Sequence, residues 1–185
     1  MSPVNLESLA QQVVERARPG EQVEAYVARS GETEVRVYEG EVENFVAAQS
    51  EGVGVRIIRD GRTGFSYAGT LDPGVLDEVI AEARDNLAFG TVDEWAGLAE
   101  PDGVAVIEQQ LWNDAIAELP AERKVEMAKE LERITLARDA RIRVDDANYA
   151  DSWSEVAVST TTGIHRTGRG NGLYVTVSTL ATDGD

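Results

Sequence analysis

A single histidine, His165, is the one side chain in this 185-residue sequence whose type suits acid–base chemistry near neutral pH. Such a residue is a candidate general base, provided that a serine or a carboxylate lies beside it in space. The spacing of the sequence identifies no such partner. We therefore interpret His165 as a surface or rim residue of a strand, and a hydrolase that uses His165 remains an alternative hypothesis.

Metal sites of the common kinds lack their ligands in this sequence. There is no Cys, and one His cannot supply a zincin helix or a three-His zinc site. The acidic pairs Asp145-Asp146 and Asp93-Glu94 offer oxygen ligands, but no EF-hand loop is present, and adjacent carboxylates on a strand point to opposite faces. We interpret these pairs as solvated surface and predict that this chain holds no catalytic or metal-binding residue.

The glycine-rich segment Gly52–Gly64 invites comparison with phosphate-binding loops. Ile57 stands where the third glycine of a dinucleotide-binding motif belongs, and the sequence contains no Gly-Lys-Ser/Thr. Val53 and Val55 alternate with smaller or polar residues, and Asp60-Gly61 favours a tight turn. The segment therefore predicts a β-hairpin whose glycines serve backbone turns and close packing.

Composition narrows the classes of partner. The formal net charge is −17 and the sequence pI is about 4.4, so the chain repels nucleic acid and anionic membranes. No apolar run is long enough to span a bilayer, and Met1–Asn5 does not resemble a signal peptide. Together with the absence of Cys, these features predict a cytoplasmic protein. Three tryptophans could stack a ligand but more often anchor a core or an interface, namely Trp95, Trp112 and Trp153.

The elements that must position these residues alternate between helical and strand periodicity. Two helices are predicted in the first half, one starting after Asn5 and ending before Pro19-Gly20, the other running from Asp72-Pro73 to Phe89-Gly90. Between them, the sequence predicts strands around Val23–Val27, Val35–Val37, Val42–Ser50, Val53–Ile58 and Thr63–Thr70, with turns at Ser30-Gly31, Glu39-Gly40-Glu41 and Asp60-Gly61.

The second half repeats the order of helix and strands. Residues 91–109 have no steady period and read as a boundary. A helix starts at Pro120 with an expected buried side made of Ala121, Lys124, Val125, Ala128, Leu131, Ile134 and Leu136. Strands follow at Ile142–Ala150, Ser154–Ser159, Ile164–Arg169 and Leu173–Ala181, separated by turn residues at Asp151-Ser152, Thr162-Gly163 and Gly170-Asn171-Gly172, before the turn-like ending Thr182–Asp185.

These elements predict an α+β protein with two units, each built from helix plus antiparallel or mixed sheet. The second sheet is expected to be incomplete at its C-terminus. The predicted organisation is an N-terminal α/β domain at residues 1–90, a connecting segment at 91–119, and a helix with strands at 120–185 that begins a central domain.

Several stretches resemble one known family. Tyr38–Phe45 and the hairpin Glu51–Ala68 closely resemble the N-terminal region of the TldD/PmbA family, also called modulators of DNA gyrase, and the similarity continues through Asp93–Ala99 and the later helix and strands. The resemblance implies a subunit of a cytoplasmic, heterodimeric zinc metallopeptidase that processes unfolded peptides. The implied partner is a second TldD/PmbA-type subunit.

The resemblance also limits what this chain does. In that family, the catalytic subunit carries a His-Glu-x-x-x-His motif, and zinc is implied for that subunit; this sequence has no such motif, so no catalytic or metal residue can be transferred to it. The chain is therefore expected to be a non-catalytic region that supports assembly and substrate enclosure. It is either the N-terminal piece of a longer protein or the metal-free, PmbA-type partner, which Asn86–Pro101 resembles more. A stand-alone acidic interaction module without enzymatic activity is the alternative.

Overall fold

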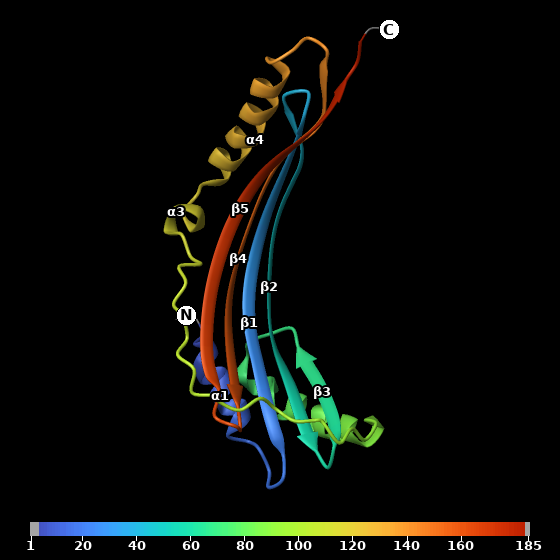
Figure 1. The fold of residues 1–185 in the computed structure, drawn as a ribbon, viewed down its shortest axis with the longest axis vertical. Coiled ribbons are helices and arrows are strands. Elements are labelled where there is room, and N and C mark those ends of the chain that lie inside the picture. Colours follow the sequence, from blue (N-terminus) through green and yellow to red (C-terminus); the bar gives the residue numbers. More distant parts are fainter. Residues whose placement is uncertain (1–3, 184–185) are drawn as a thin grey trace. The chain divides into compact units, whose positions relative to one another are not determined.

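The computed structural model describes residues 4–183, which form an α+β fold around one five-stranded antiparallel sheet. The strand order is β3-β2-β1-β4-β5 (Figure 1). The strands are β1 (Gln22–Tyr38), β2 (Glu41–Arg59), β3 (Arg62–Ala68), β4 (Ile142–Thr160) and β5 (His165–Ala181), and the α-helices are α1 (Leu6–Val14), α2 (Leu76–Asn86), α3 (Asp114–Ala117) and α4 (Ala121–Leu136).

The expectation of two separate sheets is wrong, because the described strands form one sheet. Three of the predicted turns lie inside uninterrupted strands. Ser30-Gly31 lies inside β1, Asp151-Ser152 inside β4, and Gly170-Asn171-Gly172 inside β5. The predicted turns that are real have glycines with positive φ, which are Gly40 at 77°, Gly61 at 71° and Gly163 at 95°. The glycines inside the strands do not adopt that conformation, and β1, β2, β4 and β5 reach 17 to 19 residues.

The chain divides into two compact units that share these strands. Unit 1 comprises residues 1–29, 50–109 and 155–169, and unit 2 comprises residues 30–49, 110–154 and 170–185. This division interleaves the chain, and the domain boundaries expected at residues 90 and 120 stay predictions. Two short segments lie outside the described residues. One is Met1–Pro3, part of the segment examined for a signal peptide, and the other is Gly184-Asp185, part of the predicted closing turn.

Unit 1 packs α1 and α2 against its part of the sheet. Asn5 caps α1 as predicted, since its side chain accepts a hydrogen bond from the Ser8 N–H, and Asp72 caps the short 3-10 turn (Pro73–Val75) that leads into α2. The predicted apolar stripe of α2 is buried. It joins one core cluster with α1, alternate residues of β1 and β2, and Ala157 of β4. The cluster includes Leu9, Val13, Val23, Ala25, Val27, Val53, Val55, Ile57, Leu76, Val79, Ile80, Ala83, Leu87 and Ala157.

Gly64 on β3 shows why unit 1 needs glycine in its hairpin. The pairing of β2 with β3 is antiparallel and closes at Asp60-Gly61, as predicted. A methyl group added at Gly64 would lie 2.0 Å from the carbonyl oxygen of Ala83 and 2.9 Å from the Leu87 nitrogen. The helix therefore approaches β3 more closely than any larger residue would allow.

Unit 2 packs α4 against its part of the sheet (Figure 1). The core cluster is small and contains Val35, Val37, Ala128, Ala147 and Tyr149, all fully buried. The predicted buried side of α4 is wrong at both ends, because Ala121 is exposed and Ile134 and Leu136 are 38% and 43% exposed. At the C-terminal end, Glu132 is buried instead, because its carboxylate accepts a hydrogen bond from the Gly40 N–H at 2.7 Å and so holds the β1–β2 turn.

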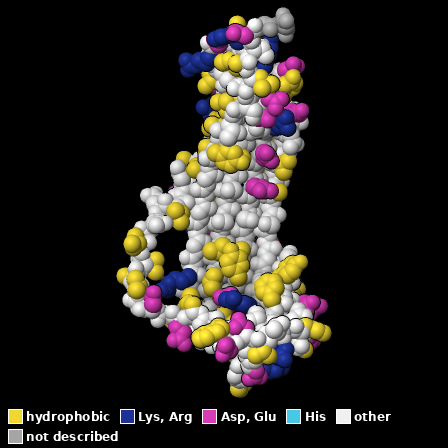
Figure 2. Space-filling view, turned by 45° about the vertical axis from the view of Figure 1, so that its right-hand side comes forward, with side chains coloured by type: hydrophobic (Ala, Val, Ile, Leu, Met, Phe, Trp, Pro, Cys, Tyr) yellow, Lys and Arg dark blue, Asp and Glu magenta, His cyan; other side chains and the backbone are white. Residues whose placement is uncertain are grey.

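The surface is acidic, with both charge signs interspersed. On the face shown in Figure 2, Lys and Arg side chains lie among Asp and Glu side chains and apolar groups. Within residues 4–183, no helix is long and apolar enough to cross a membrane.

Candidate functional site

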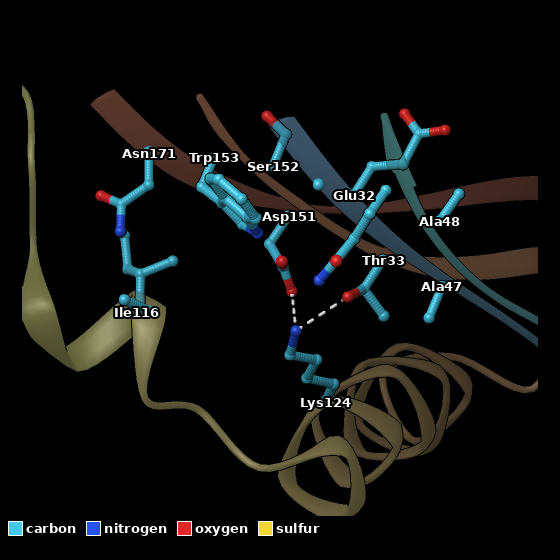
Figure 3. A pocket seen from close by; sticks show the side chains of 13 residues that line it. Glu32, Thr33, Ala47, Ala48, Ile116, Lys124, Asp151, Ser152, Trp153 and Asn171 are labelled. Carbon is cyan, nitrogen blue, oxygen red and sulfur yellow. Dashed lines mark hydrogen bonds and ion pairs between the residues drawn. The ribbon is translucent and has the colours of Figure 1, made fainter. Parts of the chain in front are cut away.

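Unit 2 contains a hollow of about 250 Å³ beside α3 and α4. Four strands contribute to its walls, and Lys124 reaches it from α4 (Figure 3). Its lining residues are Gly31, Glu32, Thr33, Ala47, Ala48, Gln49, Ile116, Ala117, Lys124, Asp151, Ser152, Trp153 and Asn171. We refer to this hollow as the Lys124 pocket.

A buried ion pair forms one wall of the Lys124 pocket. The Lys124 Nζ lies 2.5 Å from the Asp151 Oδ2 and donates a hydrogen bond of 2.9 Å to the Thr33 Oγ1 (Figure 3). The side chains of Lys124 and Asp151 are only 12% and 7% exposed. Charges are rarely buried unless they are paired, so this pair fixes α4 at a defined position on β1 and β4.

Tyr149 lies behind the ion pair in the core of unit 2. The Lys124 Nζ is 5.9 Å from the centre of the Tyr149 ring, close enough for a cation–π contact. Burial raises the pKa of Tyr149, and the nearby carboxylate of Asp151 raises it further. The Tyr149 hydroxyl is buried and has no hydrogen-bond partner of acceptable geometry among residues 4–183.

Trp153 and Asn171 form the opposite wall of the pocket. The Trp153 ring lies directly on β1 at Gly31, where an added methyl group would be 2.4 Å from the indole Nε1. Asn171 binds a passing segment, because its backbone N–H donates to the Leu111 carbonyl at 2.9 Å. Its side-chain amide accepts from the Asn113 N–H at 2.8 Å and donates to the Asn113 carbonyl at 2.9 Å. These contacts hold the chain just before α3 against β5.

The Lys124 pocket is suited to binding by hydrogen bonds and not to nucleophilic chemistry. Of its three charged residues, Lys124 and Asp151 neutralise each other, and Glu32 is exposed to solvent. Its hydroxyl groups, Thr33 and Ser152, have no imidazole beside them in the lining. The aromatic wall and the small residues Gly31 and Ala47 leave space for an apolar body next to the polar groups.

His165 lies in unit 1, at the start of β5. Its Nδ1 is 3.3 Å from the hydroxyl of Ser159, which is only 1% exposed. No carboxylate contacts the imidazole among the described residues, so the third member of a catalytic triad is not present there. A hydrolase that uses His165 is not supported by this geometry.

The other residues singled out from the sequence are dispersed. Asp146 lies 3.8 Å from Arg36 on β1, and Asp93 accepts a hydrogen bond from the Trp95 N–H. Trp95 itself is 86% exposed and so does not anchor the core, whereas the alternative that it anchors an interface stays a prediction. Of the three tryptophans, Trp153 is the one that lines the Lys124 pocket.

Two family models match the chain. PmbA/TldA metallopeptidase domain 1 matches residues 23–87, and the PmbA/TldA metallopeptidase central domain matches residues 114–185. Together the two models cover well over half of the sequence. The chain belongs to the PmbA/TldD family. A further match, to an uncharacterized protein of Methanocaldococcus jannaschii, is 32% identical over 79 residues, which are 43% of this chain and 18% of that protein.

Solved structures with the same fold match this chain over nearly its whole length. A candidate modulator of a DNA gyrase from Thermotoga maritima has a TM-score of 0.82 at 20% identity and covers 98% of this chain and 41% of its own. TldE from Thermococcus kodakarensis has a TM-score of 0.80 at 22% identity, and the match covers 97% of this chain and 39% of TldE. The chain thus spans about two fifths of the length of these proteins, and at such identities the likeness shows the fold alone.

Zinc is implied by the PmbA/TldD resemblance for the catalytic subunit, and the residues that the structure describes do not offer a set of ligands that fits it. Within residues 4–183, no three His, Asp or Glu side chains converge so that they could hold a metal ion. We therefore derive no chemical step through a metal here.

The sequence does not predict the Lys124 pocket, although it places one of its residues on the correct side of a helix. Lys124 was expected on the buried side of its helix, and a charged residue in an apolar stripe is a usable signal for a buried partner. Gly31, Asp151 and Asn171 were assigned to turns. Nothing in local sequence indicates that these three positions line one hollow on adjacent strands.

Proposed function

We propose that this chain is the N-terminal, non-catalytic region of a PmbA/TldD-type peptidase subunit in the cytoplasm. In this role, it supports assembly with a second PmbA/TldD-type subunit and helps to enclose unfolded peptide substrates. The observation that carries the proposal is the presence of domain 1 and the central domain of one metallopeptidase family in a single chain.

We further assign the chain to the PmbA-type partner, which lacks zinc ligands. The passage Asn86–Pro101, which resembles the PmbA-type partner more, supports that assignment. Catalysis and zinc then belong to the second subunit.

Co-expression with the TldD-type subunit of the same genome tests this proposal. We expect the two chains to co-purify at a fixed ratio. We expect hydrolysis of an unfolded casein peptide mixture to require the second subunit's His-Glu-x-x-x-His motif and to increase when this chain is present. Neither co-purification nor an increase in hydrolysis would favour the stand-alone interaction module.

The same preparation addresses the chain by itself. Elemental analysis after dialysis is expected to find no stoichiometric zinc in the chain alone, and His165→Ala is expected to leave hydrolysis by the complex unchanged. Zinc bound by the chain alone and lost in His165→Ala would overturn the assignment of a non-catalytic role.

A further inference from the structure

The Lys124 pocket occurs where three strands carry residues that favour turns. Gly31 on β1, Asp151 on β4 and Asn171 on β5 each interrupt the strand pattern of the sequence, yet all three line the same hollow. Local sequence that conflicts with the global fold is expected mainly at functional sites. The conflict at three separate strands therefore points to a function for the pocket beyond holding the sheet together.

The buried ion pair retains unused hydrogen-bonding capacity. An ammonium group has three N–H donors, and Lys124 donates one to Thr33 and forms an ion pair with Asp151 among the described residues. The Asp151 Oδ2 that faces Lys124 is buried and has no hydrogen bond of acceptable geometry among the described residues. The Tyr149 hydroxyl, which also lacks such a bond, lies near the same carboxylate, so Asp151 has accepting capacity left. A donor and an acceptor thus lie side by side at the wall of the pocket (Figure 3).

We propose that the Lys124 pocket binds an amide group. The amide oxygen accepts a hydrogen bond from the Lys124 Nζ, and the amide N–H donates one to the Asp151 carboxylate. An amide is neutral and offers one donor and one acceptor, which matches an ion pair whose own charges are balanced. The third charged lining residue, Glu32, is exposed to solvent, which screens its charge. The donor and acceptor of an amide are adjacent, as the two groups in the pocket are.

The rest of the pocket fits the apolar part of a small amide. The volume of about 250 Å³ is several times the roughly 30 Å³ that one water occupies in the liquid. It is below the range of about 300–1,000 Å³ that is typical for drug-sized ligands. Trp153 provides an apolar wall for one side chain or one methyl group. The ligand is thus one residue in size, either a main-chain peptide group or an Asn or Gln side chain.

This inference deepens the proposed function, because an unfolded peptide is a chain of amides. The connection to peptide substrates rests on the proposed function. The prediction that the pocket binds an amide rests only on the geometry of the pocket. Titration of the ¹⁵N-labelled 185-residue chain with two probes tests it. Acetyl-alanine methylamide presents main-chain amides, and propionamide presents a primary amide. We expect the Trp153 indole N–H signal to shift with a Kd in the millimolar range, while the exposed Trp95 signal does not move.

Matched probes and variants make the result specific. The ester counterpart of propionamide, methyl propionate, has no N–H to donate to Asp151 and should bind at least tenfold more weakly. Ala47→Leu enlarges a lining side chain next to Thr33 and leaves both members of the ion pair in place, and it should also weaken binding at least tenfold (Figure 3). Ala88→Leu is the exposed control in unit 1 and should bind as the wild type does.

The double variant Lys124→Met/Asp151→Asn removes both charges together and so avoids leaving one buried alone. It should abolish the shift while its other amide signals remain dispersed. Binding of either probe with these dependences supports the inference, and the tighter probe identifies the source of the amide. No shift with either probe, or equal binding of amide and ester, would overturn it. Co-purification with the second subunit is scored separately, so either proposal can fail alone.

Discussion

Arg84 on α2 forms an ion pair that ties unit 1 together, and its replacement by Met is the sharpest test of the packing described above. The Glu21 side chain is fully buried, and Arg84 is 15% exposed. Arg84 donates from Nε to the Glu21 Oε1 at 2.9 Å and from Nη2 to the Glu21 Oε2 at 3.0 Å, and Nη2 also bonds the Arg16 carbonyl. Arg84→Met keeps much of the apolar stem but leaves the Glu21 carboxylate without its cation.

The expected loss follows from what Glu21 can do in the variant. Burial by itself raises the pKa of Glu21, but the hydrogen bonds from Arg84 and from the Arg18 N–H outweigh it and lower the pKa below the usual 4.5. Without Arg84, the carboxylate stays ionised or takes a proton. Protonating a group of pKa 4.5 at pH 7 costs about 3.4 kcal/mol, which limits the penalty from the buried charge. We therefore expect a loss of about 3 kcal/mol at pH 7, within the range for a broken buried pair.

The same reasoning predicts how the loss depends on pH. In the wild type, the stabilisation by Glu21 is complete above its unfolded pKa and is lost only as the pH falls through its lower folded pKa. In the variant, the cost of protonation at pH 5 is only about 0.7 kcal/mol. The difference between variant and wild type should therefore shrink by up to about 2.7 kcal/mol between pH 7 and pH 5.

Urea unfolding followed by far-UV circular dichroism measures this difference. With a slope of roughly 2 kcal/mol per M, a loss of about 3 kcal/mol lowers the midpoint by about 1.5 M. Arg133→Met is the control, because Arg133 pairs with Glu130 at the surface, where the side chains are 66% and 56% exposed, and it should barely move the midpoint at either pH. An equal loss for Arg84→Met at pH 5 and pH 7 would show that packing, not charge, is responsible.

Three further predictions concern other parts of the fold. Gly64→Ala should lower the free energy of unfolding by roughly 1–3 kcal/mol in the same urea assay, because its methyl group would overlap the Ala83 carbonyl, whereas Gly69→Ala, with open space around it, should have little effect. Tyr149→Phe removes a buried hydroxyl without a partner and should be neutral or stabilising by about 1 kcal/mol, and spectrophotometric titration should find Tyr149 still protonated when exposed tyrosines ionise. Strand β5 is an edge of the sheet, so light scattering should show self-association that increases as salt screens the net charge of −17, and a monomeric mass at every salt concentration would contradict this.

Much of unit 1 could be predicted from the sequence, because its signals are local. The Asn5 cap, the apolar stripe of α2 and the Asp60-Gly61 hairpin each depend on residues close together in the chain. The resemblance to the PmbA/TldD family had the same basis and is confirmed by the two family models. The helix in unit 2 was found as well, although its last turn was assigned to the wrong side because Glu132 is held by a distant turn.

The errors have a single physical origin. A glycine or aspartate inside a strand forms a turn only if the chain direction can reverse at that residue. At Gly31 and Asp151, contact with a distant side chain keeps the backbone extended. The Trp153 ring needs the space above Gly31, and Lys124 pairs with Asp151 across the gap between α4 and β4. These partners lie more than twenty residues away in sequence, so no window of local pattern contains them. The residues that mislead local reasoning are thus those that the tertiary structure uses to build the Lys124 pocket.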